Sequence, residues 1–90
     1  MTILQKNNSN DLLKIGEHIR KWRKEKGIKQ HDFATRLYVS RKILRKVEQN
    51  KIPVDHLQVR IIAWQLKINF SQLLIDPDIL YHLNYELSYN

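Results

Sequence analysis

Glycine and proline are scarce in this sequence, which holds only two of each among 90 residues. Because β-hairpins depend on glycine in their tight turns, this scarcity argues against a hairpin-rich β fold, and the many helix-forming residues favour an all-α fold. Cysteine does not occur, which excludes a disulfide scaffold and any thiolate metal or nucleophile site. The length suits one domain, or one domain with a tail.

Positive charge is concentrated in one part of the chain. The net charge is +7, but residues 1–67 carry all 16 Lys and Arg and a net charge of +10, whereas residues 68–90 carry a net charge of −3. Within residues 20–51 the net charge is +9, a density that repels itself unless a polyanion or solvent screens it. A polyanionic partner is the first functional hypothesis, and a solvated basic surface is the alternative. A helix lying on a membrane fits less well, because the cations are spread over several short segments.

Apolar spacing and capping residues predict a series of short helices. Apolar residues recur at helical steps from Leu12 to Trp22, after a capping Asp11 and before a left-handed stop at Gly27. The predicted helices span residues 12–26, 30–37, 41–49, 56–66 and 70–75, with a sixth after Asp76-Pro77 and with Ser40, Asp55 and Asn69 as further N-caps. No apolar run approaches the ~18–20 residues of a membrane span, and no signal peptide is evident, so we expect a soluble, cytoplasmic protein.

Residues 29–50 form a helix-turn-helix candidate with an apolar inner side and a basic outer side. The predicted inner side consists of Phe33, Ala34, Leu37, Val39, Leu44 and Val47. The small Ala34 suits two helices that cross at close range. The second helix of the pair projects Arg41, Lys42, Arg45 and Lys46 outward near its beginning, where such residues can reach guanine O6 and N7 in the major groove.

This part of the chain resembles the phage repressor/Cro-type helix-turn-helix family, also called the XRE family. The resemblance covers residues 15–74, two-thirds of the chain. It rests on IGEHIRKWRKEKGIKQ at residues 15–30, then Phe33-Ala34, Val39-Ser40, Leu44, Val47-Glu48, Ala63-x-x-Leu66 and Leu73-Leu74. The family implies a five-helix repressor-like DNA-binding domain, here with a short additional C-terminal helix, and a homodimeric repressor on a two-fold symmetric operator. We accordingly divide the chain into a flexible arm (1–10), the helix-turn-helix domain (11–75) and a C-terminal helix or tail (76–90), a possible dimerisation element.

The resemblance also implies roles for individual residues. The base-reading positions are Ser40, Arg41, Lys42 and Lys46. The phosphate-binding positions are Lys29, Gln30, Arg45, Gln49, Asn50 and Lys51, and Gln30 can also brace a base-reading side chain. Arg23 and Glu48 match an ion pair that orients the recognition helix without touching DNA.

Three positions depart from the family pattern. Tyr38 replaces a frequent glycine in the turn, and because a bulky residue at positive φ is costly we expect the turn to be reshaped. Ile43 either packs inward or contacts a thymine methyl group. Asn50 replaces a glycine after the recognition helix, where it is a tolerable left-handed terminator.

The segment 56–68 is more apolar than one core face requires. A stripe beyond the expected core face predicts a dimer or partner interface, formed by Leu57, Ile61, Trp64 and Ile68 together with Ile79, Leu80 and Leu83. The alternatives are that the C-terminal segment of the same chain covers the stripe, through Ile79, Leu80 and Leu83, or that these are ordinary exposed apolar residues. The acidic tail is expected to contribute to the interface.

The sequence offers no chemistry typical of an enzyme. The four histidines, His18, His31, His56 and His82, lack metal-ligand spacing, so we expect no metal and no cofactor. The resulting hypothesis is a sequence-specific regulator that binds double-stranded operator DNA and so associates with the nucleoid. A protein-interaction module, such as an antitoxin that also binds a toxin or an adaptor, is the main alternative, and a non-specific architectural DNA binder is a weaker one.

Overall fold

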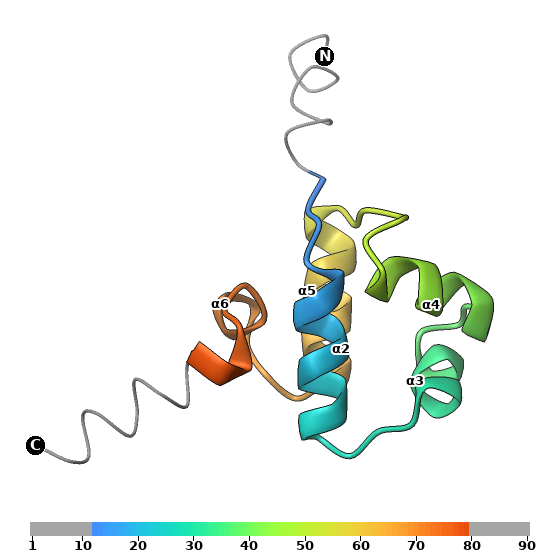
Figure 1. Ribbon diagram of the computed structural model, residues 1–90, viewed down its shortest axis with the longest axis horizontal. Helices are drawn as coiled ribbons and strands as arrows, with labels where there is room; N and C mark the ends of the chain where they lie inside the picture. The colour runs from blue at the N-terminus through green and yellow to red at the C-terminus, as the bar shows by residue number, and fades with distance from the viewer. Residues whose placement is uncertain (1–11, 80–90) are drawn as a thin grey trace, which may run out of the picture.

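The computed structural model describes residues 12–79, which fold into a set of short α-helices without a strand (Figure 1). The helices are α2 (Gly16–Glu25), α3 (Gln30–Arg36), α4 (Arg41–Glu48), α5 (His56–Gln65) and α6 (Phe70–Leu73). The predicted all-α class is confirmed. The predicted arm, residues 1–10, and the tail residues Leu80 and Leu83 lie outside the described residues.

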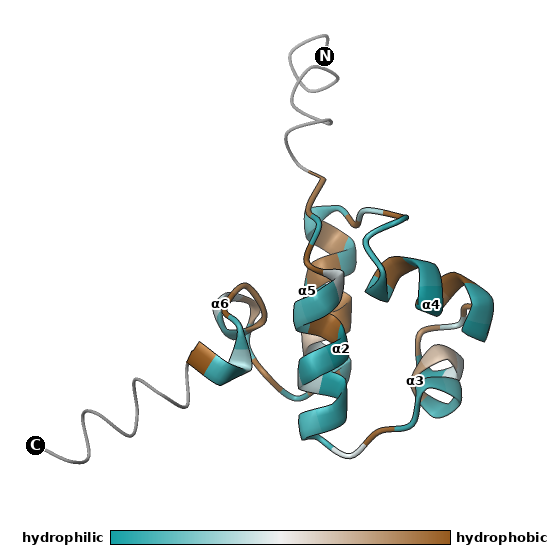
Figure 2. Cartoon of the chain, in the orientation of Figure 1, coloured by the Kyte–Doolittle hydropathy of each residue, from teal (hydrophilic) through white to brown (hydrophobic). Residues whose placement is uncertain are grey.

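Every helix contributes at least one fully buried side chain to a single core. The most buried of these are Ile19, Phe33, Leu44, Val59 and Leu73, one from each helix in chain order. In Figure 1, α3 and α4 lie on one side of α2 and α5, and α6 lies on the other side. Figure 2 shows that hydrophobic residues dominate α5, whereas hydrophilic residues predominate along α2. No helix within residues 12–79 is long and apolar enough to cross a membrane.

The start of α2 differs from the predicted one. The helix begins at Gly16 rather than after a capping Asp11, because Leu13 pairs with Val54 through two backbone hydrogen bonds of 2.7 and 3.1 Å. The N–H of Gly16 donates to Oδ1 of Asn50 at 2.7 Å, so a side chain far along the sequence replaces the expected local cap. A Cβ atom at residue 16 would overlap the carbonyl oxygen of Val47, which shows how closely α2 approaches the end of α4.

The other predicted N-caps are confirmed. Side-chain oxygens of Ser40, Asp55 and Asn69 each accept a hydrogen bond from the backbone N–H three residues later, at 3.1, 2.8 and 2.8 Å. The last two form complete capping boxes in which a glutamine returns the hydrogen bond. Asp76 likewise accepts the N–H of Asp78 at 2.8 Å, and residues 77–79 are helical, as the Asp-Pro pair predicts. The helix α6 is shorter than predicted and ends at Leu73.

Within residues 12–79, three residues other than glycine adopt the left-handed conformation: Tyr38 (φ 59°), Asn50 (φ 63°) and Lys67 (φ 62°). The expectation that Tyr38 reshapes the turn is wrong, because the backbone keeps the conformation that glycine would take, with the residue 95% exposed. Asn50 ends α4 as predicted. Lys67 was not anticipated, and it ends the α5 segment so that Ile68 turns back and packs against the core.

Candidate nucleic-acid interface

The helix pair α3 and α4 is built as the sequence predicts. Phe33 and Ala34 of α3 are 0% and 2% exposed, and they share the core with Leu44 of α4. The N–H groups of Tyr38 and Val39 each donate to a carbonyl of the last turn of α3 at 3.1 Å, which closes the turn. Of the predicted inner side, Val39 is the exception because it is 38% exposed.

The predicted base-reading residues gather at the start of α4. Ser40, Arg41 and Lys42 are exposed, while Lys46, one turn further on, is half-buried. The Ser40 hydroxyl also caps the helix by accepting the N–H of Ile43. Ile43 itself takes an intermediate position, 39% exposed at the rim of a hollow beside α4.

The predicted phosphate-binding residues flank α4 at both ends. Lys29 is exposed and Gln30 half-buried at the start of α3, and Arg45 is exposed within α4. Gln49, Asn50 and Lys51 are exposed after α4, but their backbone N–H groups donate to carbonyls of α4 at 3.0, 3.0 and 2.8 Å. Any phosphate contact at this end must therefore come from side chains, and the amide oxygen of Asn50 is already bonded to Gly16.

A buried ion pair joins α2 to the end of α4. Arg23 donates from Nε to Oε2 of Glu48 at 2.7 Å and from Nη2 to Oε1 at 3.2 Å, with the two side chains 8% and 2% exposed. Arg23 Nη1 also donates to the carbonyl of Ile28 at 2.8 Å. No side-chain nitrogen or oxygen buried within residues 12–79 lacks a hydrogen-bond partner. The pair is thus held in one geometry by bonds to both charges.

Gln30 connects this ion pair to the recognition helix. Its Nε2 donates to Oε1 of Glu48 at 3.0 Å, and its Oε1 accepts a hydrogen bond from Nε of Arg41 at 3.1 Å. The contact between Gln30 and Glu48 was missed in the sequence, since 18 residues separate the two and neither spacing nor residue type indicates it.

A second polar cluster lies between α2 and the segment after α6. Lys21 Nζ contacts Oδ2 of Asp76 at 2.8 Å and Oδ2 of Asp78 at 3.1 Å. The hydrogen bonds that Lys21 donates to both carboxylates raise the pKa of Lys21, and the same hydrogen bond to Asp76 lowers the pKa of Asp76. Trp22 Nε1 donates to the carbonyl of Ile75 at 3.1 Å in the same region. These acidic residues therefore pair with a cation of α2 as well as starting a helix.

The predicted apolar stripe on α5 is exposed in part. Leu57, Ile61 and Trp64 are 67%, 44% and 75% exposed, and Ile79 is 57% exposed. Ile68 does not continue the stripe, because α5 ends at Gln65 and Ile68 packs against the core.

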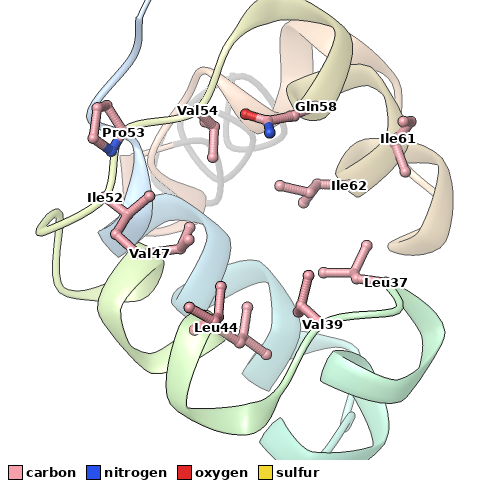
Figure 3. A pocket seen from close by; sticks show the side chains of 11 residues that line it. Leu37, Val39, Leu44, Val47, Ile52, Pro53, Val54, Gln58, Ile61 and Ile62 are labelled. Carbon is pink, nitrogen blue, oxygen red and sulfur yellow. The ribbon is translucent and has the colours of Figure 1, made fainter.

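An apolar hollow of about 200 Å³ separates α4 from α5. Figure 3 shows Leu37, Val39 and Leu44 on one side of it and Ile61 and Ile62 on the other. Its lining offers a single polar side chain, that of Gln58. Within the described part of the chain, no three His, Asp or Glu side chains are placed to hold a metal ion.

The arrangement matches a known family of helix-turn-helix proteins. A family model described as HTH_3, helix-turn-helix, matches residues 19–63, half of the chain and the segment from α2 to α5. No curated protein sequence matches the chain significantly.

Solved structures share the fold. The clp gene regulator ClgR from Corynebacterium glutamicum has a TM-score of 0.66 at 22% identity, covering 70% of this chain and 82% of its own. A hypothetical transcription factor NHTF from Neisseria has a TM-score of 0.66 at 23% identity, and the match covers 78% of this chain and 80% of the Neisseria chain. An HTH_3 family transcriptional regulator from Vibrio cholerae has a TM-score of 0.63 at 22% identity, and the match covers 74% of this chain and 38% of the Vibrio chain. The resemblance to helix-turn-helix regulators is thereby confirmed, and the chain belongs to the HTH_3 helix-turn-helix family.

Proposed function

We propose that this protein is a sequence-specific transcriptional regulator that places α4 in the major groove of double-stranded DNA. The observation that carries the proposal is the exposed basic start of α4, with Arg41 held by Gln30 on a rigid helix pair. Membership of the helix-turn-helix family and the regulatory names of the structural neighbours support a DNA-binding role without catalysis.

The residues divide into two roles. Base edges are read by Ser40, Arg41, Lys42 and Lys46. Phosphates are bound by Lys29, Gln30, Arg45, Gln49, Asn50 and Lys51, which set the register of the helix on the duplex. The positive charge of residues 20–51 supplies the non-specific attraction to DNA phosphates that precedes the reading of base edges.

Selection of bound duplexes from a random pool, followed by titration of the selected site, tests the proposal. A specific regulator binds its site ~10³-fold or more tightly than random duplex at the same salt concentration. Arg41→Ala should cost ~1–3 kcal/mol of binding and relax preference at one base pair, whereas Lys51→Ala should weaken binding to all sequences alike and lower the salt slope by about one. Arg20→Ala, which removes an exposed charge from α2, is the matched control. A preference for the selected site below ~10-fold would instead indicate an architectural binder.

We further propose that the protein is a homodimer that represses by occupying a two-fold symmetric operator. The exposed Leu57, Ile61 and Trp64 lie at helical spacing on α5 and are apolar side chains of the kind that subunits cover, and Ile79 is exposed as well. The interface expected from the sequence also includes Leu80 and Leu83, which lie outside the described residues. Two copies would present their α4 helices to half-sites ~34 Å apart. Sedimentation as a monomer well above micromolar concentration would contradict the dimer, and Trp64→Lys should weaken association while leaving the fold intact.

The same exposed surface favours one other candidate, in which it binds a different protein, as in an antitoxin or an adaptor. Trp64 is the strongest indication, since a tryptophan that is 75% exposed is typical of a protein interface. A second protein that co-purifies in stoichiometric amount, and is lost in Trp64→Lys, would support this candidate over the homodimer.

A further inference from the structure

Four helices, α2 to α5, end in the same kind of turn. In each, one backbone N–H donates to the carbonyl three residues earlier, and the next N–H donates to the carbonyl five residues before it, which is the Schellman motif. The motif requires a residue in the left-handed conformation, and those in that place are Gly27, Tyr38, Asn50 and Lys67. Glycine is the usual residue there and asparagine is tolerated, whereas a left-handed tyrosine is strained.

No contact of its side chain compensates for the strain at Tyr38. Asn50, in the same conformation, uses its Oδ1 to accept the N–H of Gly16 at 2.7 Å. Tyr38 is 95% exposed, so its ring and hydroxyl touch almost nothing within residues 12–79. The hydrogen bonds that close its turn come from the backbone, and glycine would form them equally well. Strain that brings the fold no contact indicates a role for the side chain outside the fold.

The position of Tyr38 distinguishes it from Lys67, because Tyr38 lies in the turn between α3 and α4. Figure 1 shows this helix pair on the side of the molecule opposite to α6. In helix-turn-helix complexes the first helix of the pair crosses the DNA backbone and the second lies in the major groove. The turn between them therefore passes the edge of the groove, where the phosphates lie. The exposed Arg36 and Arg41, which end α3 and begin α4, place positive charge on both sides of Tyr38.

The chemistry of tyrosine suits this edge of the groove. Its hydroxyl can donate a hydrogen bond to a phosphate oxygen, and its apolar ring can cover part of a deoxyribose. Contacts to phosphate and sugar position a protein on the duplex without distinguishing one base from another. A neutral hydroxyl also displaces no counterion from the DNA, in contrast to a lysine or an arginine at the same place.

We infer that Tyr38 contacts the DNA backbone and that its hydroxyl donates a hydrogen bond to a phosphate at the edge of the major groove. This inference rests on the proposed function, and it extends the binding surface from α4 into the turn. The family resemblance does not indicate the contact, since the family often has glycine at this position. One residue thus lowers the stability of the free protein through its strain and raises the affinity for DNA through its side chain.

The test uses the full chain, the duplex selected by the wild-type protein and a random duplex. Tyr38→Phe removes the hydroxyl alone, and Tyr38→Gly removes the side chain together with the strain. Lys67→Gly is the matched control, because it relieves the same strained conformation on the connection from α5 to α6. Dissociation constants are measured at several salt concentrations, and thermal unfolding is recorded for every variant.

Stability and affinity should change in opposite directions in Tyr38→Gly. We expect its melting temperature to rise by roughly 2–8 °C, as in Lys67→Gly, while Tyr38→Phe melts like the wild type. Tyr38→Phe should weaken binding to both duplexes by roughly 2- to 10-fold, and Tyr38→Gly should weaken it at least as much. The salt slope should stay unchanged in both Tyr38 variants, in contrast to the loss of about one expected for Lys51→Ala. Lys67→Gly should bind both duplexes like the wild type.

Three results would overturn the inference. Tyr38→Phe that binds both duplexes as tightly as the wild type would exclude the hydrogen bond to phosphate. A loss confined to the selected duplex would indicate a base contact instead. A melting temperature of Tyr38→Gly below that of the wild type would show that the side chain supports the fold. A wild type that enriches no sequence is a different result, because it refutes the specificity in the proposed function while the random duplex still tests the Tyr38 contact.

Discussion

Lys21 and Arg23 lie two residues apart on α2, and each is bonded to a carboxylate far away in the sequence, but in unlike surroundings. Arg23 and Glu48 are almost fully buried, with side chains 8% and 2% exposed. Lys21 and its partners lie at the surface and are only partly covered, with side chains 29% exposed for Lys21, 19% for Asp76 and 78% for Asp78. Burial makes the first pair costly to break and fixes the recognition helix, whereas solvent weakens the second pair and leaves it sensitive to salt and pH.

Removing one partner of the buried ion pair should give the largest loss of stability and so tests the difference between the two pairs most severely. Glu48→Ala leaves the Arg23 charge and Gln30 Nε2 without their acceptor, so the free energy of unfolding should fall by ~3–5 kcal/mol. Urea denaturation followed by circular dichroism measures this. Asp78→Ala is the matched control on the exposed side and should change stability far less.

Replacing both members of the buried pair separates stability from recognition. Arg23→Met with Glu48→Met removes both charges together, and such replacements are often neutral or stabilising. We expect the double variant to fold but to lose the orientation of Gln30. A double variant as unstable as Glu48→Ala would show that the pair is needed for folding itself.

The close approach of α2 and α4 is the next feature to test. In Gly16→Ala the added methyl group would overlap the Val47 carbonyl oxygen and lie 2.8 Å from that of Glu48. Both obstacles are backbone, so the helices must separate and the free energy of unfolding should fall by ~1–3 kcal/mol. Lys24→Ala, at an exposed position of the same helix, should stay within ~0.5 kcal/mol of the wild type. If the two variants were equally stable, the close approach of α2 to the end of α4 would be contradicted.

The exposed cluster should show the smallest effect, visible mainly in its pH dependence. Lys21 lowers the pKa of Asp76 in the folded protein. The stabilisation that the ionised Asp76 contributes is therefore present above its ordinary pKa of 3.8 and is lost as the pH falls through the lower folded pKa. Because the pKa of Lys21 is raised in the folded protein, the stabilisation that Lys21 contributes is present below its ordinary pKa of 10.5. It is lost as the pH rises through the folded pKa.

Asp76→Asn isolates this charge effect, because asparagine still accepts the N–H of Asp78 as a cap. We expect the melting temperatures of wild type and variant to differ slightly at neutral pH and low salt, and to converge as the pH falls through the lowered folded pKa of Asp76 and in 1 M salt. A difference that persists in high salt would indicate that the cluster acts through packing rather than charge.

Much of the fold was predictable because its signals are local. The N-caps Ser40, Asp55 and Asn69 act on a backbone group three residues away, so the sequence shows donor and acceptor together. The start of α2 was not predictable in this way, since its cap is Asn50, 34 residues away. The end of α5 was predicted to within a residue, but the inward turn of Ile68 was missed because Lys67 adopts a conformation that its residue type does not favour.

The sequence alone determined an all-α chain, the helix-turn-helix pair and the basic character of the face at α4, since composition, apolar spacing and charge are properties of neighbouring residues. Only the tertiary structure decided which polar groups meet. It brought Glu48 to Gln30, directed the Gln30 amide oxygen toward Arg41 and packed Ile68 against the core. The physical reason is that a hydrogen bond depends on distance and direction, and between separate helices both are set by how the core packs.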